Sequence, residues 1–189
     1  MDSHLKTYNA PRNRSGFSTP AKLFHWITVL LLIVQYTIGW LMPDVHKDTQ
    51  PIGLISLHLS IGSLIVLVVL IRLVWRLTHP APPEPSALPP LIQAAARATH
   101  WLLYALLVAF PLMGWANASS RGWRVSLFGL ISLPPLSPTG SVLGHKMGDI
   151  HQVFAWVLLV AVGLHIFAAL FHHFIIKDDT LRRMLPRRR

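Results

Sequence analysis

The chain has 189 residues, of which 52% are hydrophobic and only 13% charged, and its mean hydropathy is +0.48. Soluble domains carry roughly 25% charged residues, so this composition excludes an ordinary soluble enzyme and indicates a membrane protein. The formal net charge is nonetheless +10, and a nucleic-acid-binding protein would be basic without being this apolar.

The first two apolar stretches run from about residue 23 to 42 and from about residue 54 to 75. Each is long enough to cross a bilayer, whose hydrocarbon core needs roughly 20 helical residues. A Ser-Thr-Pro run before the first stretch is typical of a helix start, and Pro43 closes that stretch. Residues 80–90 hold six prolines, so we expect an extended linker after the second span.

Two further spans are predicted at about residues 100–118 and 149–176. Pro111 lies inside the third and is expected to kink it, which neighbouring helices tolerate in a membrane. The apolar run 125–131 is too short to span, so we expect an interfacial or re-entrant segment there. The sequence therefore predicts an all-α membrane protein, with one four-helix transmembrane domain over residues 1–189.

Basic residues are divided unevenly between the two ends of this predicted bundle. The N-terminal region, the connection between spans two and three, and the C-terminal tail together hold 13 of the 17 Lys and Arg residues. By the positive-inside rule, both termini therefore lie in the cytoplasm. The two remaining connections hold only Lys47, Arg121, Arg124 and Lys146.

Eleven histidines are unusual in such a chain, because an ionisable residue inside a membrane is costly and points to function. In the fourth span, His151 and His165 are 14 residues apart, which places them within about 40° of one face and roughly 21 Å apart along the axis. The other spans repeat this interval with the pairs His25 and Gly39, His58 and Arg72, and His100 and Gly114.

Because neighbouring spans run in opposite directions, the interval predicts two histidine pairs at matching depths. His25 and His165 form the pair nearer the cytoplasm, and His58 and His151 form the outer pair. Two imidazoles facing each other across a bundle suit the two axial positions of a haem iron. The absence of cysteine excludes thiolate ligands and covalent c-type attachment, so we expect two haems b.

Three further residues fit this arrangement. Gly39 and Gly114 lie on the faces where a side chain would collide with a macrocycle. Arg72 lies at the depth of the inner haem, where a cation can neutralise buried propionates.

His172 competes with His165 as the inner ligand, since it lies seven residues further along the same face. The shared 14-residue interval favours His165. His172, His173 and His100 are then inner-side candidates for contact with a quinone, contact with a propionate or delivery of protons. Alternatively, each is an interfacial side chain that reaches headgroup water.

The residues quoted so far resemble the bacterial cytochrome b561 family of single-chain di-haem b membrane cytochromes. The resemblance covers nearly the whole chain, from Phe24-His25-Trp26 to the basic tail, and is most specific at His165 and in the run 177–184. It implies that His25, His58, His151 and His165 ligate the two haem irons.

The same resemblance implies an inner-membrane location and electron transfer from a periplasmic-side donor to membrane quinone, with ubiquinone as the expected acceptor. One member of the family oxidises superoxide, so we expect that the donor is a small anion such as superoxide. The protein would then be an oxidoreductase of the superoxide:quinone type. The alternative is a non-catalytic cytochrome b subunit that relays electrons for a partner dehydrogenase. The expected partners are thus the lipid bilayer, a quinone, and superoxide or a redox protein, with no nucleic acid.

Overall fold

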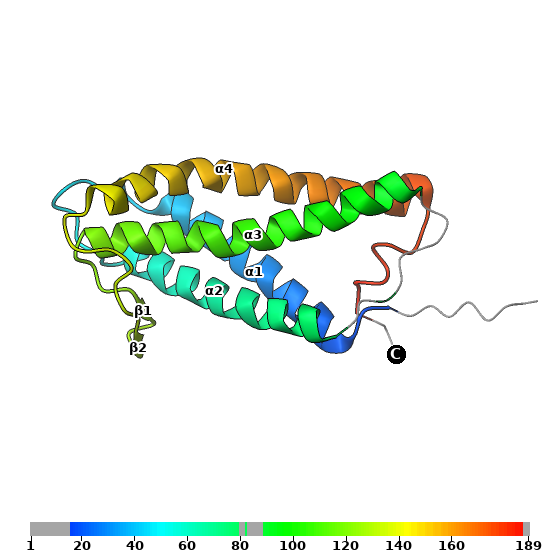
Figure 1. Cartoon of the computed structure of the whole chain (residues 1–189), viewed down its shortest axis with the longest axis horizontal. Coiled ribbons are helices and arrows are strands. Elements are labelled where there is room, and N and C mark those ends of the chain that lie inside the picture. The colour runs from blue at the N-terminus through cyan, green and yellow to red at the C-terminus, as the bar shows by residue number, and fades with distance from the viewer. Residues whose placement is uncertain (1–15, 80–81, 83–88, 187–189) are drawn as a thin grey trace, which may run out of the picture.

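The computed structural model describes residues 16–79, 82 and 89–186. Four long helices follow one another along the chain, and a two-stranded hairpin precedes the last of them (Figure 1). Each helix is long and apolar enough to cross a membrane, which confirms the predicted all-α transmembrane fold. The elements are α1 (Thr19–Leu41), α2 (Leu54–Thr78), α3 (Pro90–Ser120), β1 (Ser126–Leu127), β2 (Ile131–Ser132) and α4 (Val142–Phe171).

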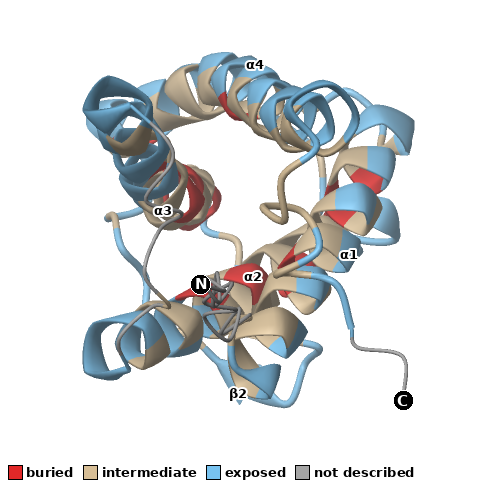
Figure 2. Ribbon diagram, turned by 90° about the vertical axis from the view of Figure 1, so that its right-hand side faces the viewer, coloured by how far each residue is buried: buried red, intermediate tan, exposed pale blue. Residues whose placement is uncertain are grey.

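The helices alternate in direction and pack as two antiparallel pairs, α1 with α2 and α3 with α4, while α2 and α3 close one side (Figures 1 and 2). Helices α1 and α4 are both described over their whole length, and no Cα atom of α1 lies within 8 Å of a Cα atom of α4. Directly packed helices have axes 8–10 Å apart. Only side chains therefore bridge the α1–α4 side, as where the Tyr36 hydroxyl donates to the Ala155 carbonyl over 2.6 Å.

Local sequence explains where two of the helices begin and end. Pro20 occupies the first turn of α1, where its missing N–H costs nothing, and Met42, the residue before Pro43, is extended and ends the helix. At the start of α4, the Ser141 hydroxyl accepts a hydrogen bond from the Gly144 amide over 3.2 Å, satisfying one of the free donors there.

Helices α3 and α4 begin earlier than the spans predicted at 100 and 149. Residues 90–99 include Leu91 and four alanines, which are strong helix formers, and residues 142–148 form the first turns of a helix that Ser141 caps. α3 also remains one helix through Pro111. Most of the expected proline-rich linker lies outside the described residues.

The short apolar run 125–131, which is expected to be interfacial or re-entrant, forms part of a β-hairpin. Ser126 pairs with Ser132 and Leu127 with Ile131, and the turn between the strands has positive φ at Phe128 and Gly129. We call the end of the bundle that carries this hairpin the outer end, and the opposite end, where the described chain starts and finishes, the inner end (Figure 1).

A small aliphatic layer lies in the middle of the bundle. Leu158 and Val69 are fully buried and Ile65 is 2% exposed, and they pack with Ile38, Ile61, Leu106, Leu107 and Phe110. Along the chain, Leu158 stands midway between His151 and His165. Many large apolar residues of the helices remain exposed, as expected for helices whose solvent is lipid. Figure 2 shows exposed residues on all four helices.

Candidate haem-binding sites

The structure brings His58 of α2 and His151 of α4 together towards the outer end of the bundle. Their ring centroids are 6.1 Å apart. Helix α3 fixes the orientation of His151, because Nδ1 donates a hydrogen bond to the Phe110 carbonyl over 2.9 Å, and the Phe110 ring stacks on the imidazole with centroids 4.0 Å apart. This bond sets the tautomer and leaves Nε2 as the free electron-pair donor.

A glycine lies against each ring, but only one of the two rings needs the side chain to be absent. A Cβ atom on Gly114 would lie 2.8 Å from Cε1 and 3.0 Å from Nδ1 of His151, whereas one on Gly39 would lie 3.6 Å from Cε1 of His58. A side chain at position 114 would therefore collide with the His151 imidazole itself. The sequence indicated only a collision with the macrocycle.

The His58–His151 pair lies in the wall of a cavity of about 580 Å³, which we call the outer cavity. This volume falls within the roughly 300–1,000 Å³ typical of pockets for small molecules and cofactors. All four helices line it, and so do Gly39 and Gly114. Further lining residues carry polar groups, among them Gln35, Tyr36, Trp115, Asn117 and Arg121. Of these, the sequence indicates only Arg121, as one of the four basic residues of the outer connections.

Towards the inner end, His165 of α4 lies between two other histidines. Its ring centroid is 6.5 Å from that of His25 on α1 and 5.5 Å from that of His100 on α3. The residues paired by depth in the sequence thus lie next to each other, and His100 joins them as a third ring.

Arg72 lies at this inner cluster, at the depth the sequence suggested. Its Nη2 is 3.1 Å from Nδ1 of His25, and its guanidinium carbon is 5.3 Å from the ring centroid of Tyr104. Since a guanidinium can only donate, Nδ1 of His25 accepts in this arrangement. The two histidine pairs therefore differ, because the outer one has a donating Nδ1 and the inner one an accepting Nδ1.

These distances suit a metal held by two imidazoles. With metal–nitrogen bonds of about 2.0 Å and a ring radius of about 1.1 Å, two rings facing one ion have centroids about 6.2 Å apart. Two imidazoles are also the axial ligand set of a haem iron whose remaining ligands come from the macrocycle.

His172 lies in a π-helical turn, His172–Ile176, that continues α4, and its direct partner is a carboxylate. Its Nδ1 donates to Oδ2 of Asp178 over 2.6 Å, and the other oxygen of Asp178 accepts from the Thr180 amide over 2.8 Å. Burial alone would raise the pKa of Asp178, but these hydrogen bonds outweigh it and hold the pKa below its ordinary value.

The segment after this turn folds back onto the start of α1. The indole N–H of Trp26 donates to the Met184 carbonyl over 3.1 Å, and the Lys22 ammonium donates to the Leu185 carbonyl over 2.9 Å. The C-terminal segment therefore closes over the inner end, and Asp178 stands at its first bend.

Asp178→Asn is expected to loosen this segment, because the variant keeps an acceptor but loses the charge that His172 and Thr180 stabilise. Trypsin cleavage after Arg182, followed by mass spectrometry at neutral pH, should become about fivefold faster, equivalent to about 1 kcal/mol. Because the folded-state pKa of Asp178 is lowered, its contribution is present above the ordinary aspartate pKa of about 3.9 and is lost as the pH falls through the lower folded value.

Asp48→Asn is the control, since its carboxylate is exposed in the connection between α1 and α2 at the outer end and forms no ion pair among the described residues. Equal cleavage rates in the two variants would contradict the role given to Asp178.

Comparison with known proteins places this arrangement in a class. A family model described as prokaryotic cytochrome b561 matches residues 16–187, which include the four helices and every histidine of the two pairs. The chain belongs to the prokaryotic cytochrome b561 family. This match confirms the family expected from the sequence. The protein is therefore a multi-pass membrane protein, and membership of the family implies that it binds haem b.

Curated relatives cover most of the chain. "Cytochrome b561 homolog 2" of Escherichia coli K12 is 34% identical over 163 residues, covering 86% of this chain and 87% of that protein. "Probable superoxide oxidase CybB" of Yersinia pestis is 33% identical over 165 residues, covering 87% and 93%. "Cytochrome b561 homolog 1" of Escherichia coli K12 is 30% identical over 177 residues, covering 92% and 98%.

Proposed function

We propose that this protein carries electrons across the bacterial inner membrane through two haems b, from a donor at the periplasmic side to membrane quinone. The observation that carries the proposal is the presence of two imidazole pairs, with centroids 6.1 and 6.5 Å apart, towards opposite ends of one bundle. Haem iron held by two imidazoles supplies reversible one-electron transfer.

In this proposal His58 and His151 hold the outer haem, and His25 and His165 hold the inner one. The fixed tautomer of His151 and the outer cavity, which all four helices line, support it. At the inner site, ligation through Nε2 of His25 requires its Nδ1 to carry a proton, so Arg72 must turn to another acceptor. A haem carboxylate suits the guanidinium, which forms strong charge-assisted bonds with such groups.

Superoxide is the proposed donor and ubiquinone the proposed acceptor. The name of the Yersinia relative supports superoxide, and the excess of basic residues in the tails and in the connection between α2 and α3 supports cytoplasmic termini. Two superoxide anions each give up one electron and leave as dioxygen, while one quinone takes up the two electrons and two protons. His100, beside the inner pair, and His172, beside Asp178, are the proposed polar contacts for quinone and its protons.

Stopped-flow spectroscopy of the purified, haem-loaded protein tests this function. Superoxide should reduce the same haems that dithionite reduces, and added ubiquinone analogue should reoxidise them. Full reduction by dithionite with none by superoxide would exclude superoxide as the donor. Co-purification of a dehydrogenase subunit that reduces the haems would then favour the relay function.

A further inference from the structure

Unpartnered polar atoms are concentrated around the outer cavity. Among the described residues, six buried side-chain nitrogen or oxygen atoms lack a hydrogen-bond partner. Burying such an atom without a partner is unfavourable, so five of them around one cavity indicate a polar ligand there. The five are Gln35 Oε1, His58 Nδ1, Trp115 Nε1, Asn117 Oδ1 and Arg121 Nε.

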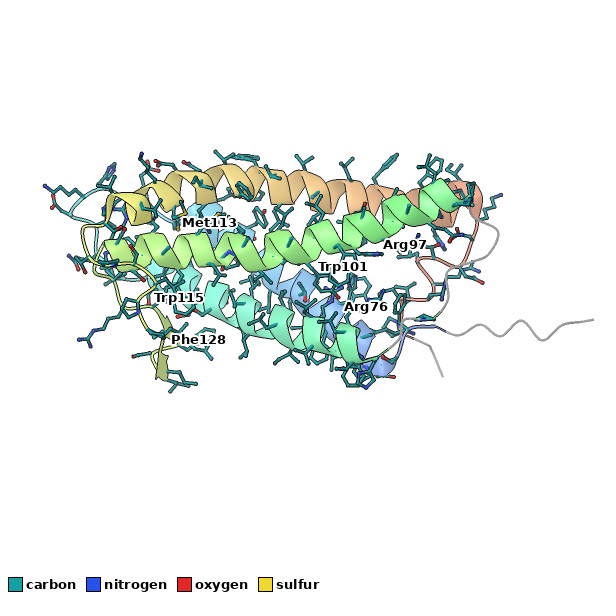
Figure 3. The ribbon with its side chains drawn as sticks, in the orientation of Figure 1. Arg76, Arg97, Trp101, Met113, Trp115 and Phe128 are labelled. Atoms are coloured by element: carbon teal, nitrogen blue, oxygen red, sulfur yellow. The ribbon has the colours of Figure 1, made fainter. Side chains whose placement is uncertain are left out.

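Two of these atoms can only donate a hydrogen bond. They are the indole Nε1 of Trp115 and the guanidinium Nε of Arg121, and both belong to the outer end of α3, where Arg121 is the C-terminal cap. Figure 3 shows Trp115 towards the end that carries the hairpin, with Arg76 and Arg97 towards the opposite end.

The guanidinium of Arg121 is held in place by the chain itself. Its Nη1 donates to the His46 carbonyl over 3.2 Å, across to the connection between α1 and α2, and its carbon is 5.5 Å from the ring centroid of Trp123. Asp44 and Asp149 also line the outer cavity, yet among the described residues Arg121 forms an ion pair with neither. Its Nε donor and its charge therefore remain available to a ligand.

We propose that Arg121 and Trp115 bind the propionate carboxylates of the outer haem. The inference rests on the proposed function and adds the residues that hold the acidic edge of the cofactor. A carboxylate accepts from both an indole and a guanidinium N–H, and its bond to the cation is charge-assisted. Because the His46 carbonyl holds Arg121 in place, Arg121 and Trp115 would hold the acidic edge of a haem bound by His58 and His151.

Two substitutions test the site with little disturbance of the fold. Arg121→Gln removes the charge, and Trp115→Phe keeps an aromatic ring but removes the donor. Arg124→Gln, an exposed cation at the same end, and Trp101→Phe, an exposed indole at the inner half of α3, are the matched controls. The measurements are the rate of haem transfer to excess apomyoglobin and the midpoint potentials of the two haems.

Arg121→Gln should release one haem at least about tenfold faster than Arg124→Gln, the scale of one charge-assisted hydrogen bond. One midpoint potential should fall, because removing a cation favours the more positive, oxidised iron. Trp115→Phe should release the same haem several times faster than Trp101→Phe, with a smaller change in potential.

The outcomes separate the two proposals. Wild-type protein that binds no haem would overturn the proposed function and this inference with it. Wild-type protein with two haems, together with an Arg121→Gln variant whose haem loss and potentials match those of Arg124→Gln, would overturn this inference alone.

Discussion

Replacing His58 or His151 by alanine is expected to lower the haem content from two per chain to one. In the proposed assignment, each substitution removes one ligand of the outer haem and leaves the inner pair intact, since the two pairs lie roughly 21 Å apart along α4. The pyridine haemochromogen assay on purified protein gives the ratio directly. His25→Ala and His165→Ala should likewise remove one haem, and spectra of the four variants should fall into two groups.

The control is His79→Ala, because His79 follows the last residue of α2, is exposed, and stacks its ring on Trp75. It should keep both haems. If each of the four ligand substitutions removed both haems while the protein stayed folded, the assignment of pairs would be wrong. Loss of haem in His100→Ala but not in His25→Ala would instead make His100 the inner ligand opposite His165.

Gly114→Ala is expected to have the second largest effect, even though it adds a single methyl group. That group would lie 2.8 Å from the His151 ring, and the ring is held in position by its hydrogen bond to the Phe110 carbonyl. Overpacking of this kind costs about 1–3 kcal/mol, so binding of the outer haem should weaken roughly ten- to a hundredfold. Haem titration of the haem-depleted protein measures this affinity.

Two glycines of the same bundle provide the comparison. A Cβ on Gly163 meets nothing within 4 Å, and one on Gly39 meets His58 at an ordinary contact distance. Gly163→Ala should bind both haems normally. A normal outer affinity in Gly114→Ala would contradict the steric argument, whereas a loss in Gly39→Ala would indicate that the macrocycle itself lies against that glycine.

The histidine positions could be inferred from the sequence because helical geometry is rigid. An interval of 14 residues repeats a face over any uninterrupted helix, and the bilayer fixes how antiparallel helices align in depth. The contacts of His25 and His58 with residues on α4 follow from those two constraints alone.

Helix ends and the hairpin were less predictable, for physical reasons. Hydropathy predicts which residues lie in the lipid, not where a helix begins. Helices α3 and α4 begin before their predicted spans, at Pro90 and Val142. The strands around Phe128 contain two residues each, too few to show an alternating pattern, and their pairing depends on a tight turn with positive φ.

Contacts that depend on how individual side chains and carbonyls pack could not be predicted. Phe110 is an ordinary apolar residue in sequence, and only the packing of α3 against α4 brings its carbonyl to His151. Arg121 is one of four basic residues in the outer connections. It differs from the others because its guanidinium donates a hydrogen bond to the carbonyl of His46, 75 positions away. His172 looked like a ligand by spacing, but its carboxylate partner lies beyond the turn that ends α4.

The aliphatic layer around Leu158 and Val69 has a consequence for what can cross this protein. An electron can tunnel through packed hydrocarbon without any polar group, but a proton needs a continuous chain of hydrogen bonds or water. The eight buried residues of the layer supply no hydrogen-bonding side chain. If the two histidine pairs hold haems as proposed, this layer would let electrons pass between them and would offer protons no polar side chain of its own.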